Sequence, residues 1–414
     1  MEPLKGNLIF GQSGGPTSVI NASAAGVFLE AMKHEGVIEE VYGAAHGIKG
    51  ILDEQFYDMR QEDPKELELL KTTPSSSLGS VRYKLADYHE DDTDYKRLLE
   101  VFKKYNIRYF LYNGGNDSMD TCNKISNFMQ EQNYDCRVMG VPKTIDNDLY
   151  GTDHSPGFAS AAKYIATSTM EVYQDAHVYN TGQITILEVM GRNAGWLTAA
   201  TALAAHKGAG PDLIYLPEIP FSLEKMTEDI KRIYDKTGKV IVAVSEGVQT
   251  EDGTYIPELV GEVKTDAFGH KQMGGTAAVL AEYVQNHFDT KVRAIEFSLL
   301  QRSASHIGSG IDIEEAYEAG AYAVRVAVEG KSDYMVGFER VSSVPYENKM
   351  VLIPLEKVAN TEKKVPREWI NEEGNFIKQE YIDYALPLIQ TESNQPKEDG
   401  LPRFARLKKV LATK

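Results

Sequence analysis

Residues 8–34 read LIFGQSGGPTSVINASAAGVFLEAMKH, and this stretch sets the pattern for most of the chain. Its apolar start at residues 8–11 predicts a buried strand, the glycine-containing loop that follows predicts a turn, and residues 19–34 have helical periodicity. Similar apolar runs, each followed by a loop and mostly by a helical segment, occupy residues 41–44, 109–112, 137–141, 184–189, 213–216, 240–245 and 292–297. Strands that alternate with helices predict mostly parallel sheets with helices on both faces.

These strand-and-helix units are too numerous for one sheet, so we expect two α/β domains. In such domains the loops at the carboxyl ends of the strands meet at a cleft, where ligands bind. The C-terminal segment is different, because it is rich in lysine and glutamate and contains several prolines. We interpret it as a peripheral extension or an oligomer contact rather than a catalytic unit.

The composition restricts the possible partners. The chain has 414 residues and a net charge of −17, and such an acidic surface repels nucleic acid and anionic lipid. A phosphate ligand would therefore need a local basic pocket. The two cysteines, Cys122 and Cys136, are too few for a disulfide framework. We find no signal peptide and no run of about 18 apolar residues, so we expect a cytoplasmic protein.

Common nucleotide-binding fingerprints are missing from the sequence. Gly330-Lys331-Ser332 lacks the first glycine of a P-loop, and no stretch satisfies GxGxxG. Two other glycine pairs follow predicted strands, Gly14-Gly15 and Gly114-Gly115. Glycines at such places let backbone amides approach an anion at a helix N-terminus. Gly14-Gly15 is equally consistent with a tight turn.

The loop GGNDS at residues 114–118 adds a carboxamide at Asn116 and a carboxylate at Asp117. This mixture suits binding of Mg²⁺ together with phosphate. Either residue would also serve as a helix N-cap, so the structural interpretation stays open beside the functional one.

The loop KTIDND at residues 143–148 carries the strongest chemical signal. It places Asp146 and Asp148 beside Lys143 and Thr144. In this arrangement a carboxylate can take a proton from a substrate hydroxyl while a cation steadies phosphate oxygens. An Asx-rich loop without a function is the alternative.

Further charged side chains fall at or near the ends of predicted strands. They are Arg82, Arg192, Glu246, Arg293 and Arg302. Each arginine alone is consistent with a surface salt bridge. Their repeated position at strand ends predicts that several of them form the basic pocket that an acidic protein needs for a phosphate ligand.

Short motifs in a fixed order connect these loops: SGG, SLGSVR, GGNDS, PKTIDND, MGRNAG, SEG and QRSASH, between residues 8 and 328. Together they resemble the phosphofructokinase family. The resemblance implies two doubly wound, mostly parallel α/β domains with the active site in the cleft between them. The phosphoryl donor and Mg²⁺ would bind the first domain, which we place at residues 1–152 joined by about 301–356. Fructose 6-phosphate would bind the second, at 153–300, and residues 357–414 would form the extension.

The resemblance also implies roles for single residues. Asp146 would be the general base for the 1-hydroxyl of the sugar, Arg82 would neutralise the transferring phosphoryl group, and Asn116 would bind the metal. The expected substrate contacts are Gly15, Thr144, Asp148, Met190, Gly191, Arg192, Glu246 and Arg302. Arg293 would reach the sugar phosphate of a neighbouring subunit, in a homodimer or a homotetramer.

Two positions indicate the phosphoryl donor. ATP-dependent members of the family have glycine where this chain has Asp117 and Lys143, and the residues found here resemble the pyrophosphate-dependent type. A carboxylate about 4 Å from an ATP α-phosphate costs about 4 kcal/mol at an effective dielectric constant of about 20. Lys143 would instead add positive charge to the pyrophosphate that is cleaved.

Three positions depart from the family pattern and affect the expected details of metal and 6-phosphate binding rather than the reaction class, and three alternative functions also stay open. Asn116 replaces a metal-associated aspartate, Gln183 replaces an inter-subunit arginine, and Leu299 replaces a histidine or tyrosine. The alternatives are an ATP-dependent phosphofructokinase, a catalytically silent regulatory subunit that binds sugar phosphate, and an enzyme that performs the same reaction on sedoheptulose 7-phosphate.

Overall fold

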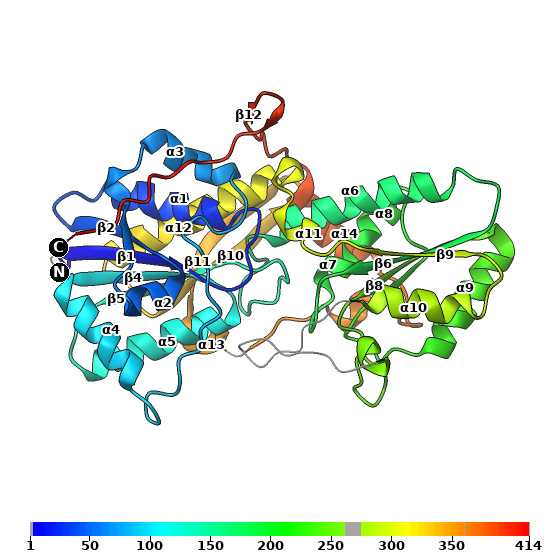
Figure 1. The fold of residues 1–414 in the computed structure, drawn as a ribbon, viewed down its shortest axis with the longest axis horizontal. Helices are drawn as coiled ribbons and strands as arrows, with labels where there is room; N and C mark the ends of the chain where they lie inside the picture. Colours follow the sequence, from blue (N-terminus) through cyan, green and yellow to red (C-terminus); the bar gives the residue numbers. More distant parts are fainter. Residues whose placement is uncertain (1–2, 261–274, 360, 414) are drawn as a thin grey trace.

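A computed structural model of the chain describes residues 3–260, 275–359 and 361–413. These residues form two lobes, and each lobe surrounds its own β-sheet (Figure 1). Both sheets are mostly parallel, which confirms the predicted α/β fold. Within the described ranges, no helix is long and apolar enough to cross a lipid bilayer.

The larger sheet has a parallel centre with an antiparallel strand at each edge. Its seven strands lie in the order β11 (Tyr346–Pro354), β10 (Tyr334–Ser343), β5 (Arg137–Pro142), β4 (Ile107–Gly114), β1 (Gly6–Gln12), β2 (Ile38–Ala44) and β3 (Phe56–Asp58). All seven residues of β1 are buried, as expected for a strand covered on both faces. The edge strands β3 and β11 and the strand β10 were not predicted from the sequence.

Helices cover both faces of the larger sheet through two separate hydrophobic clusters. One face packs against α1 (Ile20–Ala31), α3 (Pro64–Leu69) and α12 (Gly310–Val328). The other packs against α2 (Gly47–Leu52), α4 (Thr93–Lys104), α5 (Asn116–Glu131) and α13 (Leu355–Val358). The lobe is therefore doubly wound.

The smaller sheet is entirely parallel, with the strand order β7 (Leu213–Tyr215), β8 (Lys239–Ser245), β6 (Gln183–Val189) and β9 (Lys291–Glu296). One of its faces packs against α6 (Phe158–Ala176), α7 (Trp196–Ala199), α8 (Thr201–His206) and α14 (Gln379–Ala385). The other packs against α9 (Leu223–Thr237) and α10 (Thr276–Gln285). A short helix, α11 (Leu300–Ser303), follows β9 where the chain leaves this lobe.

The C-terminal segment contributes to both lobes, so its interpretation as a peripheral extension was wrong. Tyr381 of α14 is fully buried in the core of the smaller lobe. After the small hairpin of β12 (Lys397–Glu398) and β13 (Leu401–Pro402), the chain returns to the larger lobe, where Leu411 forms a β-bridge with Tyr57 (Figure 1). This role is hard to predict from the sequence, because the buried side chains are widely spaced among the lysines and glutamates of the segment.

Helices α1 and α12 touch each other backbone to backbone. A Cβ atom on Gly26 of α1 would lie 1.9 Å from the carbonyl oxygen of Tyr317, and one on Gly320 of α12 would lie 2.1 Å from that of Ser23. Helix α1 follows the Gly14-Gly15 loop, and α12 follows the segment that contains Arg302. The contact of these two helices therefore sets the spacing of two segments that carry predicted site residues.

We expect Gly320→Ala to destabilise the protein by about 1–2 kcal/mol, because the added methyl group meets backbone that cannot turn aside. This cost exceeds the gain of about 1 kcal/mol in helix propensity. Chemical denaturation monitored by circular dichroism measures the effect. Gly308→Ala is the matched control, because its methyl group would make only ordinary contacts of 3.5 Å or more. Equal stability of Gly320→Ala and the wild type would contradict the packing argument.

Candidate active site

A cavity of about 560 Å³ opens between the two lobes, at the carboxyl ends of the parallel strands. Loops after β1, β4 and β5 line it from the larger lobe, and loops after β6 and β8 line it from the smaller lobe. The structure brings most of the predicted site residues together in this cavity. They are Gly15, Arg82, Asn116, Asp117, Lys143, Thr144, Asp146, Asp148, Met190, Arg192, Glu246 and Arg302.

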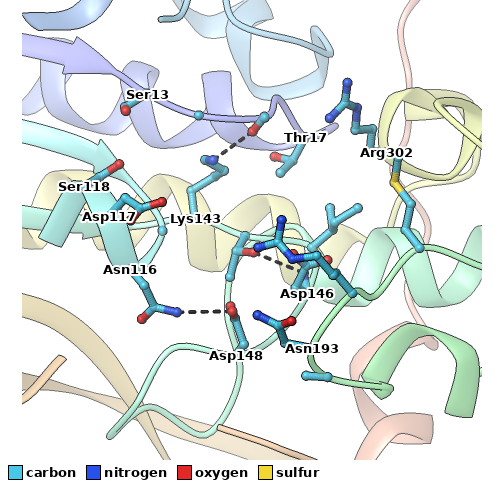
Figure 2. Close-up of a pocket in the computed structure, with 18 of the residues that line it drawn as sticks. Ser13, Thr17, Asn116, Asp117, Ser118, Lys143, Asp146, Asp148, Asn193 and Arg302 are labelled. Carbon is cyan, nitrogen blue, oxygen red and sulfur yellow. Dashed lines mark hydrogen bonds between the residues drawn. The ribbon is translucent and has the colours of Figure 1, made fainter. Parts of the chain in front are cut away.

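The loop after β1 has glycines because two cations lie against it. Gly14 has a φ of +74°, in the left-handed region that favours glycine. A Cβ atom on Gly15 would lie 2.9 Å from Nη1 of Arg302. The carbonyl oxygen of Gly15 accepts a hydrogen bond of 2.7 Å from Nζ of Lys143 (Figure 2). The glycine pair thus leaves room for both positive groups at the same end of the pocket.

The loop before α5 places two side chains in the cavity. The N-cap of α5 is Gly115, and neither Asn116 nor Asp117 caps the helix by a side-chain hydrogen bond. Asp117 is exposed to the pocket from the first turn of the helix. Nδ2 of Asn116 donates a 3.1 Å hydrogen bond to Oδ2 of Asp148, whereas Oδ1 of Asn116 is buried and receives no hydrogen bond from the described residues. Helix capping therefore does not explain why Asn116 and Asp117 occur in this loop.

The loop after β5 is held rigidly by its own polar groups and by the C-terminal segment. Oγ1 of Thr144 accepts a 3.1 Å hydrogen bond from the backbone N–H of Asp146. Asn147 is fully buried with a φ of +57°; its amide donates to the hydroxyl of Tyr384 and accepts from the N–H of Ser155. The sequence analysis assigned no role to Asn147, which here fixes the direction in which its neighbours Asp146 and Asp148 point.

The charged side chain of Lys143 is buried. Its side chain is 4% exposed, and burial lowers its pKa to about 8 although the negative charges of Asp146 and Asp148 act in the opposite direction. The positive charges of Arg302 and Arg82 add to the lowering. The ammonium group is therefore short of negative partners, and a bound anion would supply them.

The pKa values of Asp146 and Asp148 are shifted in the opposite direction, upward. These two carboxylates are partly exposed to the cavity but lie deep in the protein. Burial raises the pKa of Asp146, while the nearby Arg192 and Lys143 oppose this shift. Burial and then the charges of Asp146 and Glu362 raise the pKa of Asp148 to about 7. A raised pKa makes a carboxylate a better proton acceptor, which suits proton transfer.

The smaller lobe contributes the loop after β6, at residues 190–195. The N–H of Met190 donates to Oε1 of Gln301, at 3.2 Å. Gly191 does not line the cavity with its neighbours; it has a φ of +138° and its N–H lies 3.4 Å from Oε1 of Glu246. Burial and then the charge of Asp146 raise the pKa of Glu246 to about 7.

Arg293 lies outside this cavity. It is an exposed residue of the edge strand β9 and lines a separate hollow of about 420 Å³, together with Gln183 and Leu300. Within a single chain it does not join the other predicted site residues. The prediction that Arg293 serves a neighbouring subunit stays a prediction.

Several lining residues had no role predicted from the sequence, and four of the polar ones are considered in turn. Ser13 and Thr17 flank the glycine pair, Asn193 follows Arg192, and Glu362 comes from the C-terminal segment. The first three lie next to or within quoted motifs, so their positions carried a signal. Glu362 had none, because it lies far from every motif in the sequence.

A divalent metal would find few protein ligands here. The described part of the chain contains no cluster of three or more histidine, cysteine, aspartate or glutamate side chains that could hold a metal ion. The unpaired Oδ1 of Asn116 and the carboxylate of Asp148 are nevertheless oxygen ligands on adjacent loops. Mg²⁺ is usually held by one or two protein oxygens, with phosphate oxygens and water completing its coordination. The residues present therefore fit a metal that arrives with a phosphate ligand.

The two sides of the pocket differ in chemistry. Figure 2 shows Asn116, Asp117 and Ser118 on the left, with Lys143 next to them, and Asp146, Asn193 and Arg302 further to the right. A phosphorylated acceptor and an anionic donor would thus meet at a carboxylate that can take a proton. This arrangement supports phosphoryl transfer, which depends mainly on positioning and on neutralising charge and generally uses a divalent metal.

Comparisons with known proteins show the family. The sequence profile of the phosphofructokinase family matches residues 7–303. The pyrophosphate–fructose 6-phosphate 1-phosphotransferase of Halomonas elongata is 43% identical over 97% of this chain and 96% of its own length, and that of Xanthomonas campestris is 42% identical over 99% and 98%. The crystal structure of a pyrophosphate-dependent phosphofructokinase from Nitrosospira multiformis has a TM-score of 0.90 at 41% identity and covers 99% of this chain and 98% of its own. This chain belongs to the phosphofructokinase family.

Proposed function

We propose that this chain transfers a phosphoryl group from pyrophosphate to the 1-hydroxyl of fructose 6-phosphate. The products are fructose 1,6-bisphosphate and phosphate, and the reaction is reversible. The observation that carries the proposal is the position of Lys143 and Asp117 at the same side of the pocket, beside the Gly14-Gly15 loop. The names of the relatives from Halomonas and Xanthomonas agree with pyrophosphate as the donor.

In the proposed mechanism the oxygen of the sugar's 1-hydroxyl attacks one phosphorus atom of pyrophosphate, and the other phosphate leaves. Asp146 takes the proton of that hydroxyl. The hydrogen bond from its own N–H to Thr144 and the buried Asn147 keep its loop in place. Lys143 and Arg82 neutralise the negative charge that spreads over the transferring group. Mg²⁺, when bound through Asn116 and Asp148, supplies further positive charge to the phosphate oxygens.

The smaller lobe binds the acceptor in this proposal. Met190, Arg192 and Glu246 contact the sugar, and Arg302 contacts its phosphate from the connection between the lobes. Arg293 lies too far from the cavity of its own chain to contribute there, so it would act in the site of a second copy, as part of a homodimer or homotetramer. The larger lobe would then be the donor domain and the smaller lobe the fructose 6-phosphate domain.

The donor preference follows from charge and volume. Asp117 is exposed to the pocket and has no capping role, so its carboxylate stands free to oppose an ATP α-phosphate. Like charges about 4 Å apart cost about 4 kcal/mol at an effective dielectric constant of about 20, roughly a thousandfold in affinity. Pyrophosphate has no α-phosphate and escapes this penalty.

The first prediction from the mechanism concerns the general base. Asp146→Asn keeps the size of the side chain but cannot accept the proton, so we expect kcat to fall roughly 10²-fold to 10⁴-fold. Binding of fructose 6-phosphate, measured by calorimetry without a donor, should stay close to that of the wild type. A variant that keeps the wild-type rate would remove Asp146 from the mechanism.

The second prediction tests the donor. The wild type should form fructose 1,6-bisphosphate with pyrophosphate and Mg²⁺ but not with ATP. Asp117→Gly should make ATP binding measurable and lower the rate with pyrophosphate, because the loop loses the group that shapes it around its donor. Lys143→Gly should slow the pyrophosphate reaction roughly 10²-fold to 10³-fold without admitting ATP. Steady-state kinetics of each protein with both donors measures these effects.

Asp117→Asn is the matched control for this experiment, because it removes the charge and keeps the volume. Improved ATP binding in Asp117→Asn would assign the exclusion to charge, and improvement only in Asp117→Gly would assign it to size. Wild-type turnover with ATP and none with pyrophosphate would contradict the proposed function. Unchanged donor behaviour of Asp117→Gly would contradict the role of Asp117.

A further inference from the structure

A short part of the C-terminal segment, residues 362–365, runs between the two loops that carry the proposed chemistry. We call these four residues the strap. On the side of the larger lobe, the backbone N–H of Lys363 donates a 2.7 Å hydrogen bond to the carbonyl oxygen of Asp148, and Glu362 forms an antiparallel β-bridge with Leu149. Nζ of Lys363 donates to the carbonyl oxygens of Thr152 and Asp153, at 3.0 and 2.7 Å. The strap is thus fixed to the loop that contains Asp146.

On its other side the strap is fixed to the smaller lobe. Oε1 of Glu362 accepts a 2.7 Å hydrogen bond from Nδ2 of Asn193. The backbone carbonyl of Lys363 accepts one of 2.9 Å from Nε1 of Trp196. These two partners belong to the substrate loop at residues 190–195 and to the helix α7 that follows it. The strap therefore contacts the loops of both lobes at the active site.

A buried carboxylate of the smaller lobe strengthens this attachment. Oε1 of Glu218 accepts hydrogen bonds from the N–H of Gly195 and the N–H of Val365, at 2.9 and 3.0 Å. One oxygen atom thus joins the end of the substrate loop to the end of the strap. The spacing between the substrate loop and the loop of Asp146 is consequently set through four residues that no motif of the sequence includes.

Glu362 is the only residue of the strap, all of which is described, that lines the cavity. Its carboxylate faces the pocket near Asp146, Arg192 and Asn193, and the proposed mechanism gives it no task. An exposed glutamate at this place adds negative charge to a pocket for anions, and this charge opposes substrate binding. We therefore expect its side chain to have another role. Its hydrogen bond with Asn193 points to that other role.

We propose that Glu362 is a positioning residue for the acceptor sugar. By accepting the hydrogen bond of Asn193, it holds the neighbouring Arg192 and Met190 at the distance from Asp146 that the sugar phosphate requires. The inference rests on the proposed function, since it concerns binding of fructose 6-phosphate to that site. In this proposal the C-terminal segment sets the affinity for the acceptor sugar, and Glu362 acts through Asn193 rather than by contacting the sugar.

The test compares Glu362→Ala, Glu362→Gln, Asn193→Ala and the double variant Glu362→Ala/Asn193→Ala. Calorimetry measures binding of fructose 6-phosphate without a donor, and kinetics gives KM for each substrate. Glu368→Ala is the control, because Glu368 is an exposed glutamate of the same segment that lies outside the cavity. The chain has two tryptophans, Trp196 and Trp369, whose rings lie 6.0 Å apart beside the strap, so tryptophan emission reports whether the strap stays in place.

We expect Glu362→Ala to raise the dissociation constant of fructose 6-phosphate roughly tenfold, because a hydrogen bond to a charged group is lost. Glu362→Gln should recover most of this loss, since its amide oxygen still accepts from Asn193. Asn193→Ala should weaken binding at least as much as Glu362→Ala, because it loses the same hydrogen bond and keeps the opposing charge of Glu362, and the double variant should be no weaker than Asn193→Ala. KM for pyrophosphate and the tryptophan emission should stay unchanged in all of them, and Glu368→Ala should resemble the wild type.

Several results would overturn the inference. An unchanged affinity of Glu362→Ala would show that the hydrogen bond positions nothing. Additive losses in the double variant would mean that Glu362 and Asn193 act separately. Parallel losses for both substrates with altered emission would indicate a general structural role. These outcomes leave the proposed function intact, whereas a wild type that binds no fructose 6-phosphate would refute both.

Discussion

Scarcity of water around the charged groups of the pocket is the constraint on which the rest of the site depends. A buried charge is costly unless specific partners hold it. Lys143 therefore bonds to the carbonyl oxygen of Gly15, and Asp146 sits on a loop locked by the buried Asn147. Burial lowers the pKa of Lys143 to about 8 and raises that of Asp148 to about 7, so the free protein gives neither group enough counter-charge to offset its burial. A pyrophosphate anion with its metal would supply it.

The fold provides the partners of these charged groups from two lobes. Loops at the carboxyl ends of the parallel strands of both sheets bring charged side chains to one cleft. Its lining has four cations, Arg82, Lys143, Arg192 and Arg302, beside five carboxylates, so the cleft is not the net basic pocket that the sequence predicted. The close contact of α1 and α12 sets the spacing of the Gly14-Gly15 loop and Arg302. The strap at residues 362–365 does the same for the loops of Asp146 and Arg192.

The sequence predicted what depends on local chemistry and missed what depends on distant packing. Apolar runs followed by glycine loops predicted both parallel sheets and most of the cavity lining, because a strand end fixes where its loop lies. The buried Tyr381 was missed, since its burial depends on elements far away in the chain, and the strand β11 was missed because only one of its nine residues is buried. Glu362 was missed for the same reason. Arg293 was expected at the site, yet it lines a separate hollow, and its role toward a second copy of the chain stays a prediction.

The most direct test of the central claim is a crystal structure of the protein with methylenediphosphonate, fructose 6-phosphate and Mg²⁺. The account predicts that Nζ of Lys143 leaves the carbonyl oxygen of Gly15 or shares its bond with a phosphonate oxygen. It also predicts that the 1-hydroxyl lies within hydrogen-bonding distance of Asp146, which is about 3 Å. A diphosphonate bound away from Lys143, or a 1-hydroxyl that contacts no carboxylate, would contradict the account.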